Sequence, residues 1–361
     1  MMKMKKIFLL TLISASVLTA CNDSSSDQKQ NSDAAATSTD AILGAGSSFV
    51  YPLFSKMFEA YNKEKNIQVN YQSIGSGGGI KQLQNKIIDF GASDAPMNDD
   101  QLAKSPGPIL HIPDCLGAVC ITYNLPGDPT LKMTPDVLAD IFLGKLKNWN
   151  DSRIQSLNPD VKLPDLAIST AHRSDGSGTT YIFSDYLSKV SPDWQTQVGK
   201  GTALSWPCGV GAKGNEGVSG IIKQTPGCIG YVELAYSIQN KMPVASLKNK
   251  SGNFVAPTLA STNAAAKIDN IPADMRVSIT DTDAPDGYPI CSFSYILIYK
   301  DLSINTKSQA QAQEVLDLVK WIIQDGQQYS EALLYAKLPD SVVKQELGLL
   351  QTVTYNNKPL N

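Results

Sequence analysis

The chain has 361 residues and a mixed composition, which limits the kind of protein it can be. Hydrophobic residues make up 42% and charged residues 18%, and 31 basic against 34 acidic residues give a net charge of −3. This length is enough for two domains with a buried core. The composition excludes a disordered, collagen-like or coiled-coil protein, and without a polybasic block a nucleic-acid partner is not expected.

The first 20 residues are typical of an export signal. Three lysines precede an apolar run, Ile7 to Leu18, which is shorter than the roughly 20 residues that a membrane-spanning helix needs. The signal ends at Leu18-Thr19-Ala20-Cys21, which resembles the lipobox of bacterial lipoproteins. That resemblance implies cleavage after residue 20 and acylation of Cys21. An ordinary signal followed by a chance cysteine is the alternative.

Residues 21–40 are predicted to be a lipid-anchored flexible linker, because the stretch after Cys21 is polar and contains no large apolar side chain. The protein is then periplasmic and anchored to a bacterial membrane, which it contacts through acyl chains only. Cleavage removes three of the 31 basic residues and none of the 34 acidic ones, leaving a net charge of −6. An acidic protein has to bind an anion through a local site, because its overall field repels one.

From residue 41 onward the chain alternates short strands with amphipathic helices. We predict strands at 41–43, 67–71 and 88–92, with helices at 50–61 and 80–87 between them. The first helix is indicated by apolar residues that recur at spacings of three and one, the period of one helical face. Strands separated by helices predict parallel pairing, with helices on both faces of the sheet.

The rest of the chain continues in the same way. Further strands are predicted at 119–123, 166–170, 229–232 and 294–299. Further helices are predicted at 135–143, around 182–187, at 310–323 and at 341–350. The last two helices need a sheet to cover, and the N-terminal strands can provide it.

Four junctions between a strand and a helix carry glycine or small hydroxyl residues: Gly46-Ser47-Ser48-Phe49, Gly75-Ser76-Gly77-Gly78, Ser93-Asp94 and Ser177-Gly178-Thr179. Free amides and the positive end of the helix dipole at such junctions favour anions. Arg173, just before the last junction, adds a planar fork suited to a tetrahedral oxyanion. One such junction alone would be an ordinary helix cap or tight turn. Together they predict an oxyanion site.

These runs resemble those of the periplasmic phosphate-binding proteins of phosphate-specific ABC importers, and the resemblance extends from about Ala41 to the C-terminus. Other matching runs follow in the family's order: Gly144-Lys145-Leu146-Lys147-Asn148-Trp149, Lys213-Gly214-Asn215-Glu216-Gly217, Gly230-Tyr231-Val232-Glu233 and Leu338-Pro339-Asp340-Ser341-Val342-Val343. The resemblance implies a monomeric binding protein without a cofactor or catalytic activity. It would bind inorganic phosphate with high affinity and deliver it to the membrane permease subunits of an ABC importer.

The fold that the resemblance implies is an α/β, two-lobed periplasmic binding protein of type II-like organisation. Each lobe would be a mixed β-sheet flanked by helices, and the ligand would be held in the interlobe cleft as the lobes close about a hinge. Lobe 1 is expected to comprise residues 41–121 and 297–361, and lobe 2 residues 122–296.

The ligand contacts implied by the resemblance fall on eight residues: Ser48, Phe49, Ser76, Asp94, Arg173, Ser177, Gly178 and Thr179. Asp175 would pair with Arg173 and hold it. Asp94 would accept a hydrogen bond from a protonated phosphate oxygen and reject sulfate, which carries no proton. The alternative for Asp94 is a cap on the turn at Ala95-Pro96. The role of His172 stays open.

Five cysteines remain after cleavage: Cys115, Cys120, Cys208, Cys228 and Cys291. An exported protein can form disulfides, and Cys208 with Cys228 is the favoured pair because they flank a predicted helix between two strands. The sequence alone does not determine the connectivity. With two histidines and no zinc-finger spacing, no metal site is expected.

Three rival functions remain open. The first is an exported hydrolase, such as a phosphatase, with Ser177 or Ser76 as its nucleophile, although such an enzyme would need a base and usually a metal. The second is a receptor for sulfate, molybdate or another oxyanion. The third is a surface lipoprotein for adhesion or sensing. The run Gly209-Val210-Gly211-Ala212-Lys213-Gly214 fits the dinucleotide pattern, but we interpret it as a glycine-rich loop before a helix.

Overall fold

A mixed sheet of eight strands runs through the computed structural model, which describes residues 41–266 and 271–360. Its strand order is β2-β1-β3-β11-β4-β8-β6-β7. The strands of this sheet are β1 (Ile42–Gly46), β2 (Val69–Ser73), β3 (Phe90–Ser93), β4 (Ile109–Tyr123), β6 (Ser169–Arg173), β7 (Val210–Ala212), β8 (Cys228–Glu233) and β11 (Cys291–Tyr299).

The sheet contains two parallel groups joined by antiparallel strands. β1 pairs in parallel with β2 and β3, and β6 pairs in parallel with β7 and β8. β11 lies antiparallel to both β3 and β4, and β4 lies antiparallel to β8. The parallel pairing predicted for the first three strands is therefore confirmed, and the sheet as a whole is mixed.

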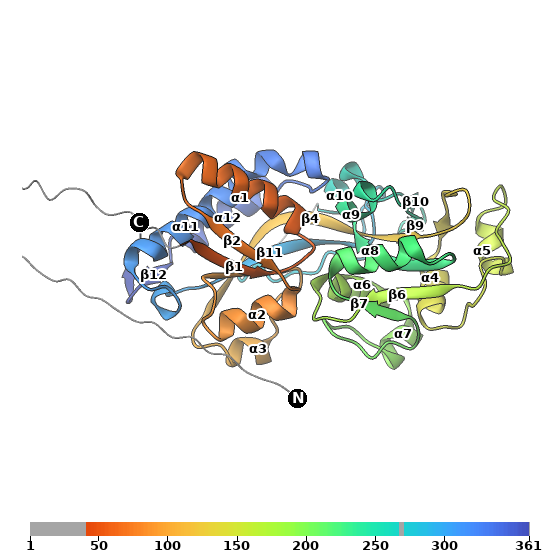
Figure 1. The fold of residues 1–361 in the computed structure, drawn as a ribbon, viewed down its shortest axis with the longest axis horizontal. Helices are drawn as coiled ribbons and strands as arrows, with labels where there is room; N and C mark the ends of the chain where they lie inside the picture. The colour runs from red at the N-terminus through yellow and green to blue at the C-terminus, as the bar shows by residue number, and fades with distance from the viewer. Residues whose placement is uncertain (1–40, 267–270, 361) are drawn as a thin grey trace, which may run out of the picture. The chain divides into compact units, whose positions relative to one another are not determined.

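Helices cover both faces of the sheet (Figure 1). Above β1, β2 and β11 in that view lie α1, α11 and α12, and below them lie α2 and α3. The helices are α1 (Tyr51–Lys65), α2 (Ser76–Gln84), α3 (Asp99–Ala103), α4 (Pro135–Phe142), α5 (Ser152–Leu157), α6 (Gly178–Val190), α7 (Pro192–Gln197), α8 (Gly214–Gln224), α9 (Leu234–Gln239), α10 (Leu259–Ala265), α11 (Gln309–Ile323) and α12 (Asp340–Leu350).

Two smaller sheets complete the described strands. One has the order β10-β9-β5 and the other joins β12 to β13. Their strands are β5 (Lys132–Met133), β9 (Ser246–Lys248), β10 (Phe254–Val255), β12 (Thr354–Tyr355) and β13 (Lys358–Pro359). Short 3₁₀ turns lie at Leu302–Ile304, Asp325–Tyr329 and Glu331–Leu333.

The predicted apolar face of α1 packs into the core. Its five buried side chains are Leu53, Phe54, Met57, Phe58 and Tyr61. Helix α2 approaches β1 so closely that a Cβ atom at Gly79 would lie 2.5 Å from the Ala45 carbonyl oxygen. Because only glycine permits this approach, the N-terminus of α2 is held against the end of β1, where the candidate site lies.

Strand β4 is much longer than the predicted strand at 119–123. Its residues 109–118 pair with β11, and 119–123 pair with β8. Pro113, Asp114 and Gly117 interrupt the apolar pattern of the first part, so the sequence did not indicate a strand there. Pairing with β11 forms this part of β4, and β4 thereby connects the two parallel groups.

Strand β6 lies three residues later than predicted. The expected strand was 166–170, whereas the structure has Ser169–Arg173. Pairing with β8 begins where Ser169 meets Cys228, and Leu166 donates its amide to the side chain of Asn148 instead of a strand. As a consequence Arg173 is the last residue of a strand and not part of the following loop.

A buried carboxylate on α6 ties this helix to the segment that leads into β11. Asp185 accepts hydrogen bonds from Lys200 at 2.7 Å and from Ser278 and Thr280 at 2.6 Å each. Burial alone would raise its pKa, but these hydrogen bonds lower the pKa of Asp185 to about 2. The ionised Asp185 therefore stabilises the folded state. This contribution to the free energy of unfolding is fully present above the unfolded-state pKa of about 3.9 and is lost as the pH falls towards 2.

We expect Asp185→Asn to lower the free energy of unfolding at pH 7 by about 1–2 kcal/mol. Urea denaturation at pH 7 and at pH 2.5 measures the effect, and the difference between variant and wild type should shrink at the lower pH. The matched control is Asp193→Asn, because that carboxylate is exposed and pairs with Lys145. A variant as stable as wild type at pH 7 would contradict this role of Asp185.

The predicted signal peptide, the acylated Cys21 and the linker at 21–40 lie outside the described residues. These three assignments stay predictions. Within residues 41–266 and 271–360, none of the helices combines the length and the apolar character needed to cross a bilayer.

Candidate ligand-binding site

Polar side chains from several strand ends and helix starts meet in the interior. Ser48 follows β1, Asp94 follows β3 and Arg173 ends β6. Ser76 begins α2, and Ser177 precedes α6. All five residues are buried, with an exposed fraction of 3% or less. The carboxyl ends of parallel strands form the usual ligand crevice of open α/β sheets, and here two such edges face each other.

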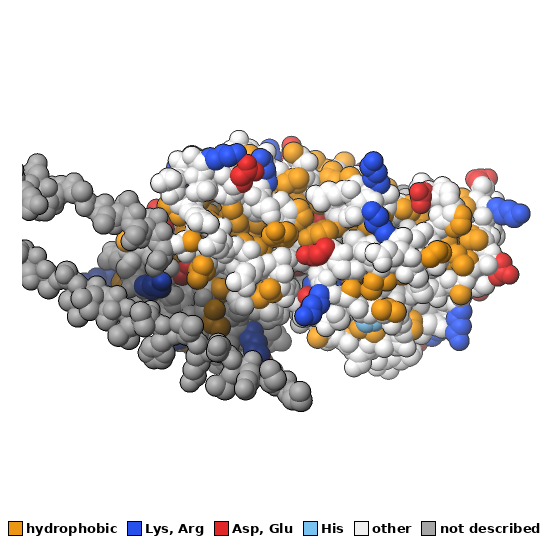
Figure 2. All heavy atoms as spheres, viewed as in Figure 1, with side chains coloured by type: hydrophobic (Ala, Val, Ile, Leu, Met, Phe, Trp, Pro, Cys, Tyr) orange, Lys and Arg blue, Asp and Glu red, His pale blue; other side chains and the backbone are white. Residues whose placement is uncertain are grey.

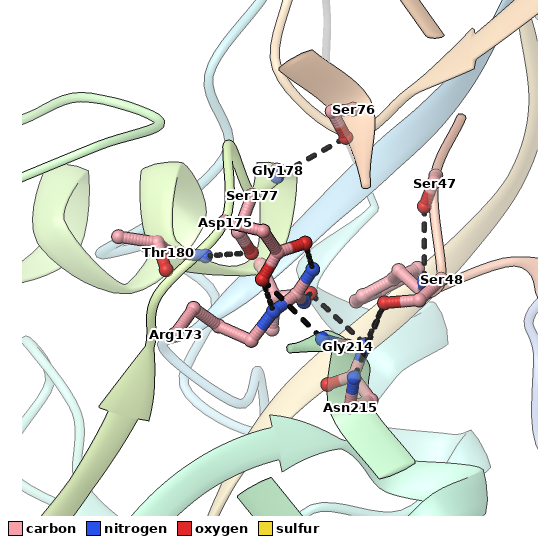
Figure 3. Close-up of polar contacts among 12 residues, drawn as sticks. Ser47, Ser48, Ser76, Arg173, Asp175, Ser177, Gly178, Thr180, Gly214 and Asn215 are labelled. Atoms are coloured by element: carbon pink, nitrogen blue, oxygen red, sulfur yellow. Dashed lines mark hydrogen bonds and ion pairs between the residues drawn. The ribbon is translucent and has the colours of Figure 1, made fainter. Parts of the chain in front are cut away.

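Direct hydrogen bonds join the two edges (Figure 3). The Gly178 amide donates to the Ser76 hydroxyl at 3.1 Å. The backbone and side-chain nitrogens of Asn215 donate to the Ser48 hydroxyl at 3.2 and 3.0 Å. The β1–β3 edge and the β6–β8 edge are therefore in contact around the candidate ligand residues, as they would be around an enclosed ligand.

Arg173 is held by a two-pronged ion pair with Asp175. Its Nε donates to Oδ1 at 2.7 Å and its Nη2 to Oδ2 at 2.5 Å. Burial would raise the pKa of Asp175, but the hydrogen bonds and charge of Arg173 lower it below its ordinary value. The third nitrogen, Nη1, reaches the Thr179 hydroxyl at 3.4 Å. Donors on both terminal nitrogens consequently remain for an anion, in a fixed orientation.

Asp94 is embedded in hydroxyl groups. Its Oδ1 accepts from Ser47 at 2.5 Å and from Ser294 at 3.0 Å, and its Oδ2 faces the Ser76 hydroxyl at 3.4 Å. Burial raises the pKa of Asp94 to about 6, against the lowering effect of these hydroxyls and of Arg173. The alternative that Asp94 caps the following turn is wrong, because the Ala95 amide donates to Ser93 instead.

The N-terminus of α6 points towards the same group of buried polar side chains. Ser177 caps the helix by accepting the Thr180 amide at 3.0 Å, so its own hydroxyl hydrogen stays available to a ligand. The Thr179 hydroxyl accepts from Asn215 at 3.2 Å as well as from Arg173. A 13-residue helix brings a partial positive charge to this end, which stabilises an anion.

The positive charge of the site is local. On the face drawn in Figure 2, the basic side chains are scattered among acidic and uncharged ones and form no single patch. The guanidinium of Arg173 lies in the interior instead, with its side chain 1% exposed. An anion at this point would interact with Arg173 and oriented amides in a region of low dielectric constant, where such interactions are strong.

The structure also brings in residues that the sequence did not single out. Asn215 bonds to Ser48 and Thr179 and accepts the Glu233 amide at 3.0 Å. Ser294 reaches Asp94 from β11 across 200 residues of sequence. Asn215 stands in one of the matching sequence runs, which was the available signal for it. Nothing in the sequence near Ser294 indicated a role.

The glycine-rich run at 209–214 is part of the sheet. The interpretation as a loop is wrong for its central residues, because Val210–Ala212 form β7 and pair with β6. The run has its strand inside the pattern and not before it, so it lacks the arrangement of a dinucleotide site. The Gly214 amide donates to Asp175 at 3.3 Å and thereby supports the ion pair with Arg173.

The disulfide expected between Cys208 and Cys228 is not formed. Cys228 pairs with Ser169 on β6, and the Cys208 sulfur lies 3.4 Å from the neighbouring Thr170 hydroxyl. Strand β6 therefore lies between Cys228 and the segment that contains Cys208. Two successive strand spacings amount to about 9–10 Å, which is beyond the reach of a disulfide. The cysteines of the described residues are all free: Cys115, Cys120, Cys208, Cys228 and Cys291.

The two histidines have structural surroundings. His172 stacks on Trp206 with ring centroids 4.6 Å apart, and its Nδ1 lies 3.1 Å from the Arg173 carbonyl oxygen. The Nε2 of His111 accepts the Met97 amide at 3.0 Å. In the part of the chain that the structure describes, no group of three or more His, Cys, Asp or Glu side chains could hold a metal ion.

Comparisons with known proteins agree with this arrangement. Residues 31–325 match the model of the PBP superfamily domain. The chain is 43% identical over 353 residues to "Phosphate-binding protein PstS" of Xylella fastidiosa strain Temecula1, covering 93% of this chain and 95% of that relative. It is 42% identical over 313 residues to the protein of the same name from Pasteurella multocida, covering 86% and 89%.

A solved structure gives the same fold at low sequence identity. The crystal structure of a phosphate-binding protein from Stenotrophomonas maltophilia aligns with a TM-score of 0.66 at 15% identity, covering 88% of this chain and 97% of that one. The predicted α/β fold of two lobes with mixed sheets is confirmed by this likeness and by the strand pairing. The chain belongs to the PBP superfamily and, within it, to the family of the phosphate-binding proteins named PstS.

Proposed function

We propose that the protein binds inorganic phosphate outside the cytoplasm and delivers it to the permease subunits of an ABC importer. The observation that carries this proposal is that one buried site contains both a fixed cationic fork, Arg173, and a carboxylate acceptor, Asp94. Donors alone would suit any tetrahedral oxyanion. A carboxylate among them suits an oxyanion that still carries a proton, and phosphate does so near neutral pH. Relatives over 40% identical carry the name phosphate-binding protein.

The proposed ligand contacts are Ser48, Phe49, Ser76, Asp94, Arg173, Ser177, Gly178 and Thr179, with Asp175 in support. Two of the amides among them already have partners inside the protein: that of Phe49 donates to the Ser47 hydroxyl at 2.9 Å and that of Gly178 to Ser76. For these amides, binding would share or exchange an existing hydrogen bond. The hydroxyl of Ser177 and the terminal nitrogens of Arg173 would bind without such an exchange.

We also propose that residues 41–121 with 297–361 form one lobe, residues 122–296 form the other, and phosphate is enclosed when they close. In support, β4 changes its partner from β11 to β8 near residue 119. Strands β4 and β11 would be the two crossings, and a pair of crossings permits hinge bending with few strained residues. The hydrogen bonds of Ser76 with Gly178 and of Ser48 with Asn215 would be contacts of the closed form.

Titration calorimetry with phosphate, sulfate and molybdate tests this function directly. We expect a monomer that binds phosphate tightly, one to one, and binds the other two anions much more weakly.

Incubation with a chromogenic phosphate ester, with and without Zn²⁺ or Mg²⁺, tests the enzymatic alternative, for which we expect no turnover. Preference for another oxyanion, or turnover of the ester, would overturn the proposal. Restored phosphate uptake in cells that lack their own receptor separates transport from adhesion or sensing.

The anchor is a separate proposal. We infer that Cys21 is acylated and that residues 22–40 act as the spacer between the membrane and the first strand. Two or more acyl chains would hold the protein durably, whereas a single chain binds reversibly. We expect Cys21→Ser to release the protein from the membrane fraction or to leave its signal uncut. Cell fractionation checks this, and a variant that stays with membranes as wild type does would contradict it.

A further inference from the structure

The two carboxylate oxygens of Asp94 differ in the hydrogen bonds that they accept. Its Oδ1 accepts two hydroxyl hydrogen bonds, from Ser47 at 2.5 Å and from Ser294 at 3.0 Å. Its Oδ2 has one distant hydroxyl, that of Ser76 at 3.4 Å. Since each carboxylate oxygen has two lone-pair directions, Oδ1 is fully occupied and Oδ2 keeps accepting capacity. The carboxylate therefore presents one oxygen to a ligand.

The Ser47 hydroxyl has little freedom to do anything else. It accepts the amides of Phe49 at 2.9 Å and Val50 at 3.4 Å, so its single hydrogen is directed to Asp94. The backbone amide of Ser47 is fixed in turn by the Ala92 carbonyl oxygen at 2.9 Å. This serine follows β1 and is held by its neighbours in a donating position.

Ser294 approaches Asp94 from a different element. It lies on β11, opposite Cys115 on β4, and it is fully buried, as Ser47 is. The two hydroxyls thus reach the same carboxylate oxygen from the end of β1 and from within β11, two strands that lie far apart in the sequence. Two neutral donors on one buried carboxylate oxygen favour its ionised form, because they replace hydration that burial has removed.

Asp94 is one of three buried acids in this region, and the other two lie in less favourable surroundings. Burial raises the pKa of Glu233 on β8 to about 8 and that of Asp114 on β4 well above its ordinary value. Glu233 is therefore largely protonated at neutral pH, and burial favours the protonated form of Asp114 as well. Arg173 on β6 favours the ionised form of Asp94. The other titratable groups facing Asp94 are neutral because burial raises their pKa values: Cys115 on β4 and Tyr71 on β2.

We propose that Ser47 and Ser294 are positioning residues that determine the anion selectivity of the site. By occupying Oδ1 they orient the carboxylate of Asp94 so that Oδ2 faces the ligand, and they keep it in the accepting, ionised form. A ligand must then bring a proton to that oxygen, which phosphate can do and sulfate cannot. This inference rests on the proposed function.

The test is the double variant Ser47→Ala with Ser294→Ala, titrated with phosphate and with sulfate between pH 5 and pH 8. In wild type the accepting form of Asp94 is present above about pH 6 and is lost as the pH falls through that value. Without the two hydroxyls this loss should begin about one pH unit higher. We expect roughly fivefold weaker phosphate binding at pH 6, less than about threefold weaker binding at pH 8, and a roughly tenfold smaller phosphate preference at pH 6.

Two controls separate positioning from general damage. Replacing both serines by threonine keeps the hydroxyls and should preserve the wild-type pH profile. Ser219→Ala removes a buried hydroxyl that has no hydrogen-bond partner among the described residues, so it should leave binding unchanged. A merely structural role would weaken binding by the same factor at every pH.

The inference is overturned if the double alanine variant keeps the wild-type pH profile and selectivity. It is also overturned if the threonine variant loses as much as the alanine variant. In either case the wild-type protein still binds phosphate. Wild type that binds no phosphate in the same titration would instead overturn the proposed function.

Discussion

Arg173→Ala should weaken phosphate binding by about a hundredfold or more. Asp175 occupies the Nε and Nη2 of Arg173, which leaves donors on both terminal nitrogens for the anion. Each hydrogen bond from a charged donor contributes about 1.5–3 kcal/mol, so the loss of two amounts to about 3–6 kcal/mol. Titration calorimetry with phosphate measures the effect. A loss below about threefold would contradict the role of Arg173 as the cation of the site.

Part of that loss comes from Asp175, because removing the arginine leaves the partly buried carboxylate of Asp175 unpaired and next to the anion. The double variant Arg173→Ala with Asp175→Asn removes this repulsion and should recover part of the affinity that the single variant loses. Arg173→Lys keeps the charge but loses the fork that fits Asp175, so it should resemble the alanine variant more than wild type. The matched control is Arg153→Ala, because that arginine is exposed and pairs with Asp140.

Asp94→Asn should reduce the preference for phosphate over sulfate by about a hundredfold. Sites that bond a ligand's hydroxyl usually discriminate by several powers of ten against an analogue without it. Because Ser47 and Ser294 both donate to Oδ1, the amide oxygen of the asparagine should take that position. Its NH₂ group would then occupy the place of Oδ2 and donate to the ligand. Phosphate should bind more weakly, and sulfate should bind more tightly than to wild type.

Paired titrations of wild type and variant with the two anions check this selectivity. They are best made at pH 8, where the carboxylate of wild-type Asp94, whose pKa is about 6, is ionised. Asp100→Asn is the control, because Asp100 lies exposed near the start of α3. An unchanged preference in a folded variant would place the selectivity among the amide and hydroxyl donors instead.

The sequence was sufficient for the elements that carry their own signal. Helix α1 showed its apolar period, and the turns at Gly46, Gly75 and Ser177 marked where strands give way to helices. For the same reason the junctions that contain Ser48, Ser76 and Gly178 predicted an anion site, since free amides and hydroxyls at helix starts favour anions. The individual ligand contacts stay predictions that the family resemblance implies. The first half of β4 carried no such signal, because its strand character depends on β11, about 180 residues later.

What the sequence by itself determined about this protein is therefore local: which segments can form helices and strands, and which of them begin with groups that favour an anion. Tertiary structure alone decided how those groups are combined. The pairing of β11 with β3 and β4 brings Ser294 to Asp94, and the packing of α8 brings Asn215 to Ser48. It also places β6 between Cys208 and Cys228 and so prevents their disulfide. The physical reason is that hydrogen bonds and disulfides require atoms within a few ångströms of each other, and only the sheet order determines which distant residues come that close.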